Sequence, residues 1–148
     1  MKKTQEELQK TLQEKYMEYQ MFEEQVKQLQ EQVQTIQKQQ EELEGIKDSL
    51  EHLSETAVGT ELLVPLSSGI FVTSKISDTK TVLMNVGDGV VVPKSMKDAI
   101  ALVSKQKQEL ATYFDTLQQN LQMLALYHDR IEAELQHLVA QQQKNDQE

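Results

Sequence analysis

A block of forty residues in the middle of the chain, residues 56–95, interrupts two long helical patterns. It holds four of the five glycines and both prolines, Pro65 and Pro93. Its three lysines balance its three acidic residues, so the excess of acid lies in the flanking arms. Residues 1–55 have seven basic against thirteen acidic residues, and residues 96–148 have five against eight. The sequence therefore predicts a neutral, β-rich block between two acidic helices.

The N-terminal arm has an apolar seam whose steps alternate between four and three residues, the heptad spacing of a left-handed coiled coil. Thr4 and Glu7 have the spacing of a capping box, so we expect a helix over residues 4–55. An extra three-residue step from Leu43 to Ile46 predicts local overwinding of the coil. The seam up to that step consists of Leu8, Leu12, Lys15, Tyr19, Phe22, Val26, Leu29, Val33, Ile36, Gln40 and Leu43.

The C-terminal arm repeats this spacing over residues 95–145, and Ser95 with Asp98 predicts its start. When the chain is folded back at the block, residues whose numbers sum to about 150 become partners, for example Phe22 and His128. We therefore expect one antiparallel coiled coil within a single chain. A parallel dimer of long helices is the alternative, which the equal arm lengths disfavour. The second seam consists of Met96, Ile100, Val103, Lys107, Leu110, Phe114, Leu117, Leu121, Leu124, His128, Ile131, Leu135, Leu138 and Gln142.

The central block, at residues 60–94, has the pattern of two β-hairpins. Ser67-Ser68-Gly69 and Gly87-Asp88-Gly89 separate two pairs of β-rich runs, the last of them Val90–Val92. Two isolated hairpins expose apolar faces and unpaired edges. We therefore expect a single α+β domain whose hairpins complete a β-barrel in an oligomer. The candidate oligomerisation residues are Leu63, Val64, Leu66, Phe71, Val72, Val82, Val86, Val90 and Val92.

Composition argues against several classes of function. The net charge of −9 lacks the Lys/Arg surface that phosphates require, so we expect no nucleic-acid partner. Cysteine is absent, and no apolar run approaches the roughly 18 residues of a membrane span. The N-terminus lacks the apolar core of a signal peptide, so we expect a cytoplasmic protein without a membrane partner.

No grouping of side chains has the pattern of a catalytic site, so we expect no enzyme activity and no cofactor. His128 and Glu132 share a helix face and could bind a metal weakly, but no third ligand accompanies them. We therefore assign no metal. Gly87-Asp88-Gly89 lacks the third glycine and the following helix of a dinucleotide fingerprint, which makes it a hairpin turn.

Apolar side chains outside the seam gather toward both ends of the chain, whereas residues 27–45 have no such surplus. Methionine is adaptable, and exposed apolar patches mark interaction sites. Scattered apolar surface residues are common in proteins and are the alternative interpretation. The candidate binding residues at the distal tips of the coiled coil are Tyr16, Met17, Met21, Met123, Leu126, Tyr127 and Val139.

The block also contains a series of short motifs: Leu63-Val64-Pro65-Leu66, Gly69, Phe71-Val72, Lys75-Ile76 with Asp78, Val86-Gly87-Asp88-Gly89-Val90, Lys94, Asp98-Ala99 and Lys105-Gln106-Lys107. With these motifs, and with the order helix, two hairpins, helix, the chain resembles the alpha-class prefoldin subunits. It resembles the archaeal type and is similar to the eukaryotic alpha-class subunits. Pro93 beside Lys94 departs from the charged pair expected there.

The resemblance implies a hexamer of two alpha and four beta-class prefoldin subunits. It implies an ATP-independent chaperone whose coiled-coil tips capture unfolded client proteins and transfer them to a group II chaperonin. A prefoldin-like adaptor or scaffold without general chaperone activity is the alternative, and a homo-oligomeric filament is a third possibility.

Overall fold

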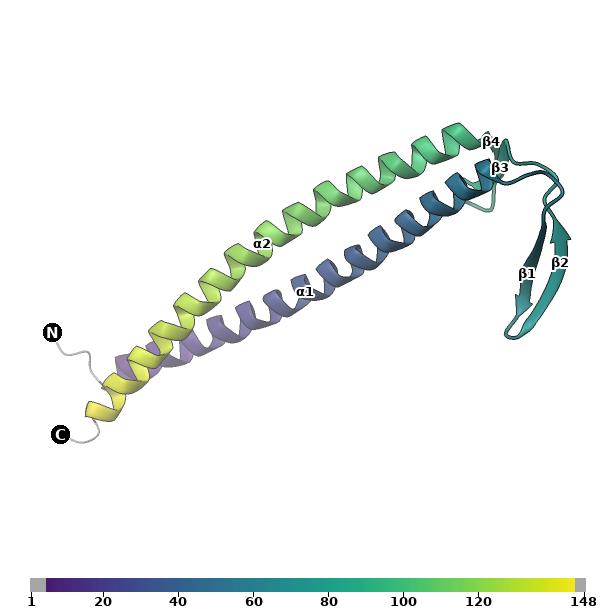
Figure 1. The fold of residues 1–148 in the computed structure, drawn as a ribbon. Helices are drawn as coiled ribbons and strands as arrows, with labels where there is room; N and C mark the ends of the chain where they lie inside the picture. Colours follow the sequence, from purple (N-terminus) through teal and green to yellow (C-terminus); the bar gives the residue numbers. More distant parts are fainter. Residues whose placement is uncertain (1–4, 146–148) are drawn as a thin grey trace. The chain divides into compact units, whose positions relative to one another are not determined.

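The computed structural model describes residues 5–145 and has two long helices and two antiparallel β-hairpins (Figure 1). This arrangement confirms the predicted α+β class. Thr4, the first residue of the predicted capping box, lies outside the described residues. The elements are α1 (Gln5–Glu55), β1 (Glu61–Ser67), β2 (Ile70–Lys75), β3 (Thr81–Asn85), β4 (Val91–Ser95) and α2 (Met96–Asn145).

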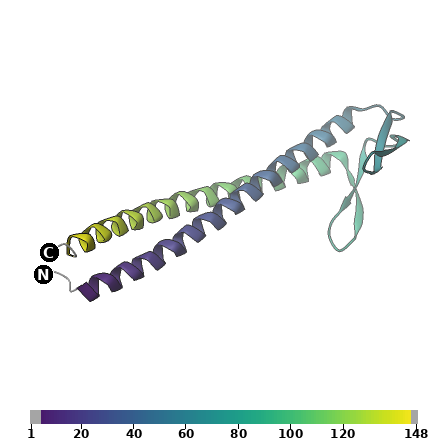
Figure 2. The same cartoon turned by 90° about the horizontal axis from the view of Figure 1, so that it is seen from below.

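The chain divides into two compact units, and each contains a part of both helices. The helical unit comprises Met1–Gln37 with Thr112–Glu148, and the hairpin unit comprises Lys38–Ala111. Within the helical unit, α1 and α2 lie side by side and run in opposite directions (Figure 2). Lys15 on α1 reaches Glu134 on α2, with 2.9 Å between Nζ and Oε2. Their residue numbers sum to about 150, as the antiparallel prediction requires.

The predicted seam is the buried stripe of the helical unit. Leu8, Val33 and Ile36 of α1 and Leu117 and Ile131 of α2 are its buried residues, and all five are predicted seam positions. The other predicted seam positions in this unit are half-buried. The heptad pattern thus identified the facing sides of both helices, because only side chains at that spacing stay on one face of a helix.

The predicted seam position at Ile46 is wrong, and the overwinding expected there stays a prediction. Ile46 is 48% exposed, whereas Leu43, Lys47 and Leu50 are half-buried, so the heptad spacing runs through Lys47 as far as Leu50. The Lys47 ammonium lies 4.0 Å from the Glu51 carboxylate. A lysine can keep its charge in water while its methylene stem covers apolar surface, so this position does not require an apolar residue.

The hairpin unit has its core at the start of α2. Met96, Ala99 and Val103 are 5%, 0% and 3% exposed. The seam prediction missed Ala99 because this residue lies between two heptad positions, Met96 and Ile100. Its side chain is small enough to be fully buried there. The amide of Met96 donates a 2.7 Å hydrogen bond to the Lys80 carbonyl, which connects the helix start to the segment between the hairpins.

The first turn of α2 is capped as the sequence predicts. The Asp98 amide donates a 3.1 Å hydrogen bond to the Ser95 hydroxyl oxygen. A serine at this position satisfies one of the amides that have no partner within the helix. The cap lets β4 pass directly into α2 without an intervening loop.

Strands β1 and β2 form the first hairpin, from the pair Glu61–Lys75 to the pair Ser67–Ile70. Ser67 pairs with Ile70, so the loop of this hairpin is Ser68-Gly69, one residue shorter than the predicted loop Ser67-Ser68-Gly69. The register shifts between Pro65 and Ser67. Pro65 therefore lies next to an irregularity, as the sequence predicts for a residue that cannot donate to a ladder.

Strands β3 and β4 form the second hairpin, from the pair Thr81–Ser95 to the pair Asn85–Val91. The predicted last strand, Val90–Val92, is wrong at both ends, since β4 starts one residue later and extends through Pro93 to Ser95. In a two-stranded sheet both strands are edges, so a proline whose nitrogen faces outward removes no ladder bond.

Gly87-Asp88-Gly89 is a turn, as predicted. All three residues have positive φ, at 116°, 49° and 74°. Glycine adopts this region freely, and aspartate adopts it more easily than most other residues. The Gly87 amide donates to the Asn85 side-chain oxygen at 3.0 Å, and the Val90 amide donates to the Gly87 carbonyl at 2.9 Å. These bonds occupy polar groups that a phosphate loop would leave for its ligand.

We expect the buried seam to dominate the stability of the helical unit. Leu117→Ala should lower the free energy of unfolding by about 2–4 kcal/mol, because Leu117 is 5% exposed and its loss leaves a cavity. Leu126→Ala is the matched control on the same helix, since Leu126 is 71% exposed, and it should cost less than about 0.5 kcal/mol. Urea unfolding followed by circular dichroism measures both. Equal losses would contradict the assignment of the seam.

Candidate functional site

The side chains proposed from the sequence as the binding site all belong to the helical unit, and all are exposed. Their exposed fractions run from 42% for Val139 to 71% for Leu126. Three positions on α1 and four on α2 contribute, so both helices present apolar surface. The seven residues are Tyr16, Met17, Met21, Met123, Leu126, Tyr127 and Val139.

Two of the seven line a groove between the helices. The groove has a volume of about 780 Å³. Leu12, Tyr16 and Tyr19 contribute to it from α1, and Leu135 and Val139 contribute from α2. Four glutamines also border it. Its walls are therefore apolar and aromatic, with amide groups around them.

Three others lie on α2, where Met123, Leu126 and Tyr127 line a smaller hollow of about 250 Å³ with Arg130. The Tyr127 ring is stacked with that of Phe22 on α1, at a centroid distance of 6.2 Å. This contact positions one wall of the hollow from the opposite helix. Met17 and Met21 line neither the groove nor this hollow, so the structure does not gather all seven residues into one site.

A cross-helix ion pair lies next to the groove. The Lys15 ammonium lies 2.9 Å from both the Glu18 and the Glu134 carboxylates. The hydrogen bonds that Lys15 donates to Glu18 and then to Glu134 raise its pKa above the ordinary value. The hydrogen bond from Lys15 lowers the pKa of Glu134. Lys15, a predicted polar seam position, thus bridges the two helices.

The ring next to Phe22 is that of Tyr127, one residue before the predicted partner His128. His128 packs instead on Tyr19, at a ring-centroid distance of 4.6 Å. The Nε2 atom of His128 is buried and has no hydrogen-bond partner within residues 5–145. Partial removal from water raises the pKa of Tyr19, and the charges of Glu23 and Glu132 add to this effect. An imidazole and a phenol therefore share this level of the seam.

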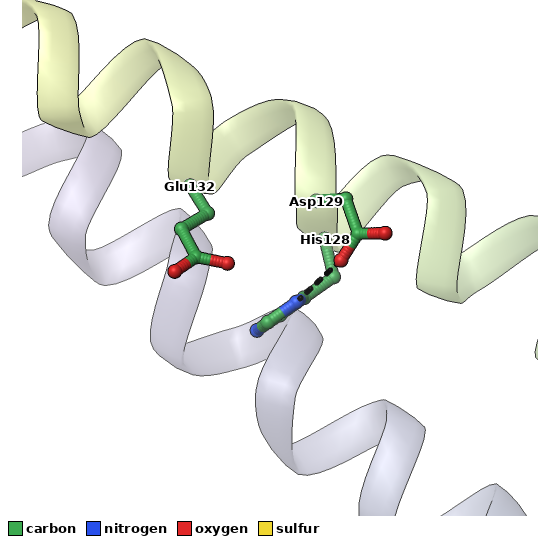
Figure 3. Close-up of side chains that lie close together, drawn as sticks. All are labelled: His128, Asp129 and Glu132. Atoms are coloured by element: carbon green, nitrogen blue, oxygen red, sulfur yellow. Dashed lines mark ion pairs between the residues drawn. The ribbon is translucent and has the colours of Figure 1, made fainter.

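His128, Asp129 and Glu132 form a cluster on one stretch of α2 (Figure 3). Each offers a ligand atom, and these atoms lie within 4.8 Å of one another. The imidazole points toward α1, and its Nδ1 lies 3.7 Å from the Asp129 carboxylate. Both carboxylates are exposed, and such surface groups commonly occur without an ion. The cluster is the described grouping best suited to a metal, and the assignment of no metal stays a prediction.

The hairpin unit carries the residues proposed for oligomerisation. In the first hairpin both faces are exposed: Leu63 and Phe71 on one face are 64% and 57% exposed, and Val64 and Val72 on the other are 37% and 42% exposed. Leu66, at the register shift, is 67% exposed. A two-stranded sheet that is apolar on both faces is marginal in water.

The second hairpin has two different faces. Val82 and Val92 are half-buried, together with Met84 and Lys94. Leu83 and Val91 on the opposite face are 73% and 53% exposed. The residues predicted from the sequence, Val82 and Val92, belong to the half-buried face, although the alternation of side chains through Leu83 was a signal for the exposed one.

Four more exposed apolar residues of the hairpin unit bear on its interaction surface. Val86 and Val90, which flank the turn, were predicted and are 55% and 53% exposed. Leu62 and Ile70 were not predicted and are 38% and 57% exposed. Consecutive apolar residues such as Leu62 and Leu63 fall on opposite faces of a strand, so such a run indicates two apolar faces.

The family model for prefoldin subunits matches residues 22–141, which include both hairpins and most of both helices. The chain belongs to the prefoldin subunit family. This is a family of chaperone subunits rather than of enzymes. The order of elements and the hairpin motifs that suggested the resemblance lie within the matched residues.

The named relatives of this prefoldin subunit include archaeal alpha subunits and the eukaryotic subunit 5, the class that the sequence resembles. It is 33% identical to prefoldin subunit alpha of Thermofilum pendens over 60 residues, which cover 40% of this chain and 46% of the relative. It is 36% identical to human prefoldin subunit 5 over 70 residues, which cover 47% of this chain and 46% of the relative. The matched part thus spans about half of the length of these relatives.

The fold is similar to that of a solved prefoldin. A chain of the filamentous PFD from Methanocaldococcus jannaschii matches with a TM-score of 0.68 at 20% identity. The match covers 78% of this chain and 95% of that one. Within the described residues 5–145, neither helix has a stretch that is long and apolar enough to cross a membrane.

The Lys15–Glu134 pair should make stability depend on pH. The lowered pKa of Glu134 gives a contribution that is present above its ordinary value of 4.5 and lost as the pH falls through the folded value. The raised pKa of Lys15 gives a contribution that is present below 10.5 and lost as the pH rises through the folded value. Lys15→Gln should therefore lower the Tm by roughly 1–2 °C at pH 7 and by less at pH 3.

The control for this pH effect is Lys105→Gln. Lys105 pairs with Glu109 within one helix at 4.0 Å, and both side chains are mostly exposed. We expect almost no change of the Tm at either pH. A Lys15→Gln loss of equal size at pH 3 and pH 7 would show that the ion pair is not its cause. Thermal melts followed by circular dichroism give both values.

Proposed function

We propose that this prefoldin subunit is part of an ATP-independent chaperone of the cytoplasm. The apolar side chains of the helical unit bind non-native client proteins, and the assembly transfers them to a group II chaperonin. The observation that carries the proposal is the exposure of all seven candidate binding residues, from 42% upward, five of which line two hollows. Membership of a family of chaperone subunits supports the same function.

Assembly would depend on the hairpin unit. Exposed apolar residues on both faces of the first hairpin and around the turn of the second need to be covered, because such surface favours association. We propose that beta-class prefoldin subunits cover it and that two alpha and four beta subunits close a β-barrel. The alpha-class relatives support this choice of partner.

Capture would be multivalent. A hollow of 250–780 Å³ holds only a few side chains, so each contact is weak. Several helical units on one platform raise the effective concentration of binding sites around a client. Because each contact dissociates readily, release requires no nucleotide, and we assign no cofactor to the protein.

Two other functions would use the same fold. An adaptor or scaffold would use the hairpins for assembly and would not suppress the aggregation of unfolded proteins. A homo-oligomeric filament would form without a beta-class subunit, and the similar filamentous PFD of Methanocaldococcus jannaschii makes that form worth testing. Native mass measurement after co-expression with a beta-class subunit distinguishes a hexamer from a filament.

Replacing Met17, Met21, Leu126 and Tyr127 together with serine should leave assembly intact and weaken suppression of client aggregation. All four are about half or more exposed, so the changes remove contact surface rather than core. Light scattering of a chemically unfolded protein during dilution measures suppression. The control is the pair Ile46→Ser and Tyr113→Ser, which removes exposed apolar side chains elsewhere. Unchanged suppression by the quadruple variant would contradict this assignment of the binding surface.

Charges on the hairpins should prevent assembly. Val64→Glu with Val90→Glu should give soluble but poorly assembled chains, because burying two unpaired carboxylates in an interface is costly. Val58→Glu is the control, since Val58 is 64% exposed and lies outside the strands. Native mass and static light scattering report the assembly. Normal oligomers of the double variant would show that these faces are not the interface.

A further inference from the structure

We infer that the groove between α1 and α2 selects polypeptide segments in which a large apolar side chain lies close to a lysine or arginine. The inference rests on the proposed function, because it specifies the kind of client segment that the helical unit binds. The occupant is an unfolded stretch of a client chain. The inference follows from the composition of the groove and from the charges next to it.

The groove has one charged side chain among its eleven lining residues, and it is acidic. That residue is Glu132 of α2, which is exposed. Leu12, Leu135 and Val139 supply apolar walls. An apolar side chain can therefore be buried within reach of one carboxylate, and a neighbouring cation on the same segment would pair with it.

Two cations near the groove, Lys15 and Arg130, are held by acids. Lys15 is bound by both Glu18 and Glu134 at 2.9 Å. Arg130 lies one turn from Glu134, with 3.5 Å between its Nε and the carboxylate. The charges of Glu132 and Glu23 also help to raise the pKa of Tyr19, which lines the groove. The one charge on the described lining of the groove is therefore negative.

The tyrosines add to the preference for cations. Tyr16, which is 54% exposed, and Tyr19 both line the groove, and an aromatic face attracts a lysine or arginine. The volume of about 780 Å³ lies within the range of roughly 300–1,000 Å³ that is usual for small-molecule sites. A few side chains of an unfolded segment fit there, and a folded domain does not.

Other occupants are disfavoured by charge. Acidic peptides and nucleic acids would be repelled by Glu132 and by the surrounding acids. A second copy of this chain would bring a further net charge of −9. Segments that combine apolar and basic residues complement both properties of the groove.

The test measures the binding of three fluorescent peptides to the full chain. The peptides share a central run of leucine and phenylalanine and differ only in their flanks, which are lysine, glutamine or glutamate. We expect the lysine-flanked peptide to bind about two- to fivefold more tightly than the glutamine-flanked one, and the glutamate-flanked one to bind most weakly. High salt should remove the difference, because it screens exposed charges.

Glu132→Gln should abolish most of the preference for lysine flanks while leaving the binding of the glutamine-flanked peptide unchanged. The control is Asp115→Asn, which removes one exposed acid of the same helix outside the groove and should retain the preference. Tyr16→Ser should weaken the binding of all three peptides. The inference is overturned if wild-type protein shows no preference, if both charge variants reduce it equally, or if Tyr16→Ser changes nothing.

This test is separate from that of the proposed function. Met17, Met21, Leu126 and Tyr127 do not line the groove, so the quadruple serine variant probes chaperone activity without altering it. Aggregation suppression without any charge preference would overturn only the selectivity. Loss of suppression in the quadruple variant together with an intact lysine preference would support both.

Discussion

A narrow apolar stripe between α1 and α2 is the packing interaction on which the helical unit depends. Among the described residues of this unit, only Leu8, Val33, Ile36, Leu117 and Ile131 are buried, so a small number of side chains stabilises two long helices. This explains how a chain with only 38% hydrophobic residues folds. Since the stripe is narrow, apolar side chains outside it in this unit, such as Leu126, remain on the surface.

Charged side chains in and beside the stripe select its register. Lys15 pairs with Glu134 across the helical unit, and Lys107 pairs with Glu44 within the hairpin unit. Both pairs join residues whose numbers sum to about 150, the register expected for antiparallel helices. Such pairs contribute little to stability at partly exposed positions. Their larger effect is on specificity, because a shift by one turn would separate each lysine from its carboxylate on the opposite helix.

The two units expose apolar surface of different kinds. The hairpins present apolar side chains on both faces of a sheet, and the block that contains them has no net charge. Such surface suits a permanent interface with another subunit. The helical unit presents separate hollows beside acidic residues. Small separate sites favour weak and reversible contacts, so a single chain can combine stable assembly with transient binding.

The order of amino acids was sufficient to predict the element types, the antiparallel pairing, the buried stripe and the Gly87-Asp88-Gly89 turn. These features depend on local spacing and on backbone preference, which are properties of the chain itself. Only the tertiary structure decided that Lys47 replaces Ile46 in the stripe and that Leu83 is exposed while Val82 is half-buried. It alone revealed the groove, because the groove combines side chains of α1 and α2 that are more than a hundred residues apart in sequence.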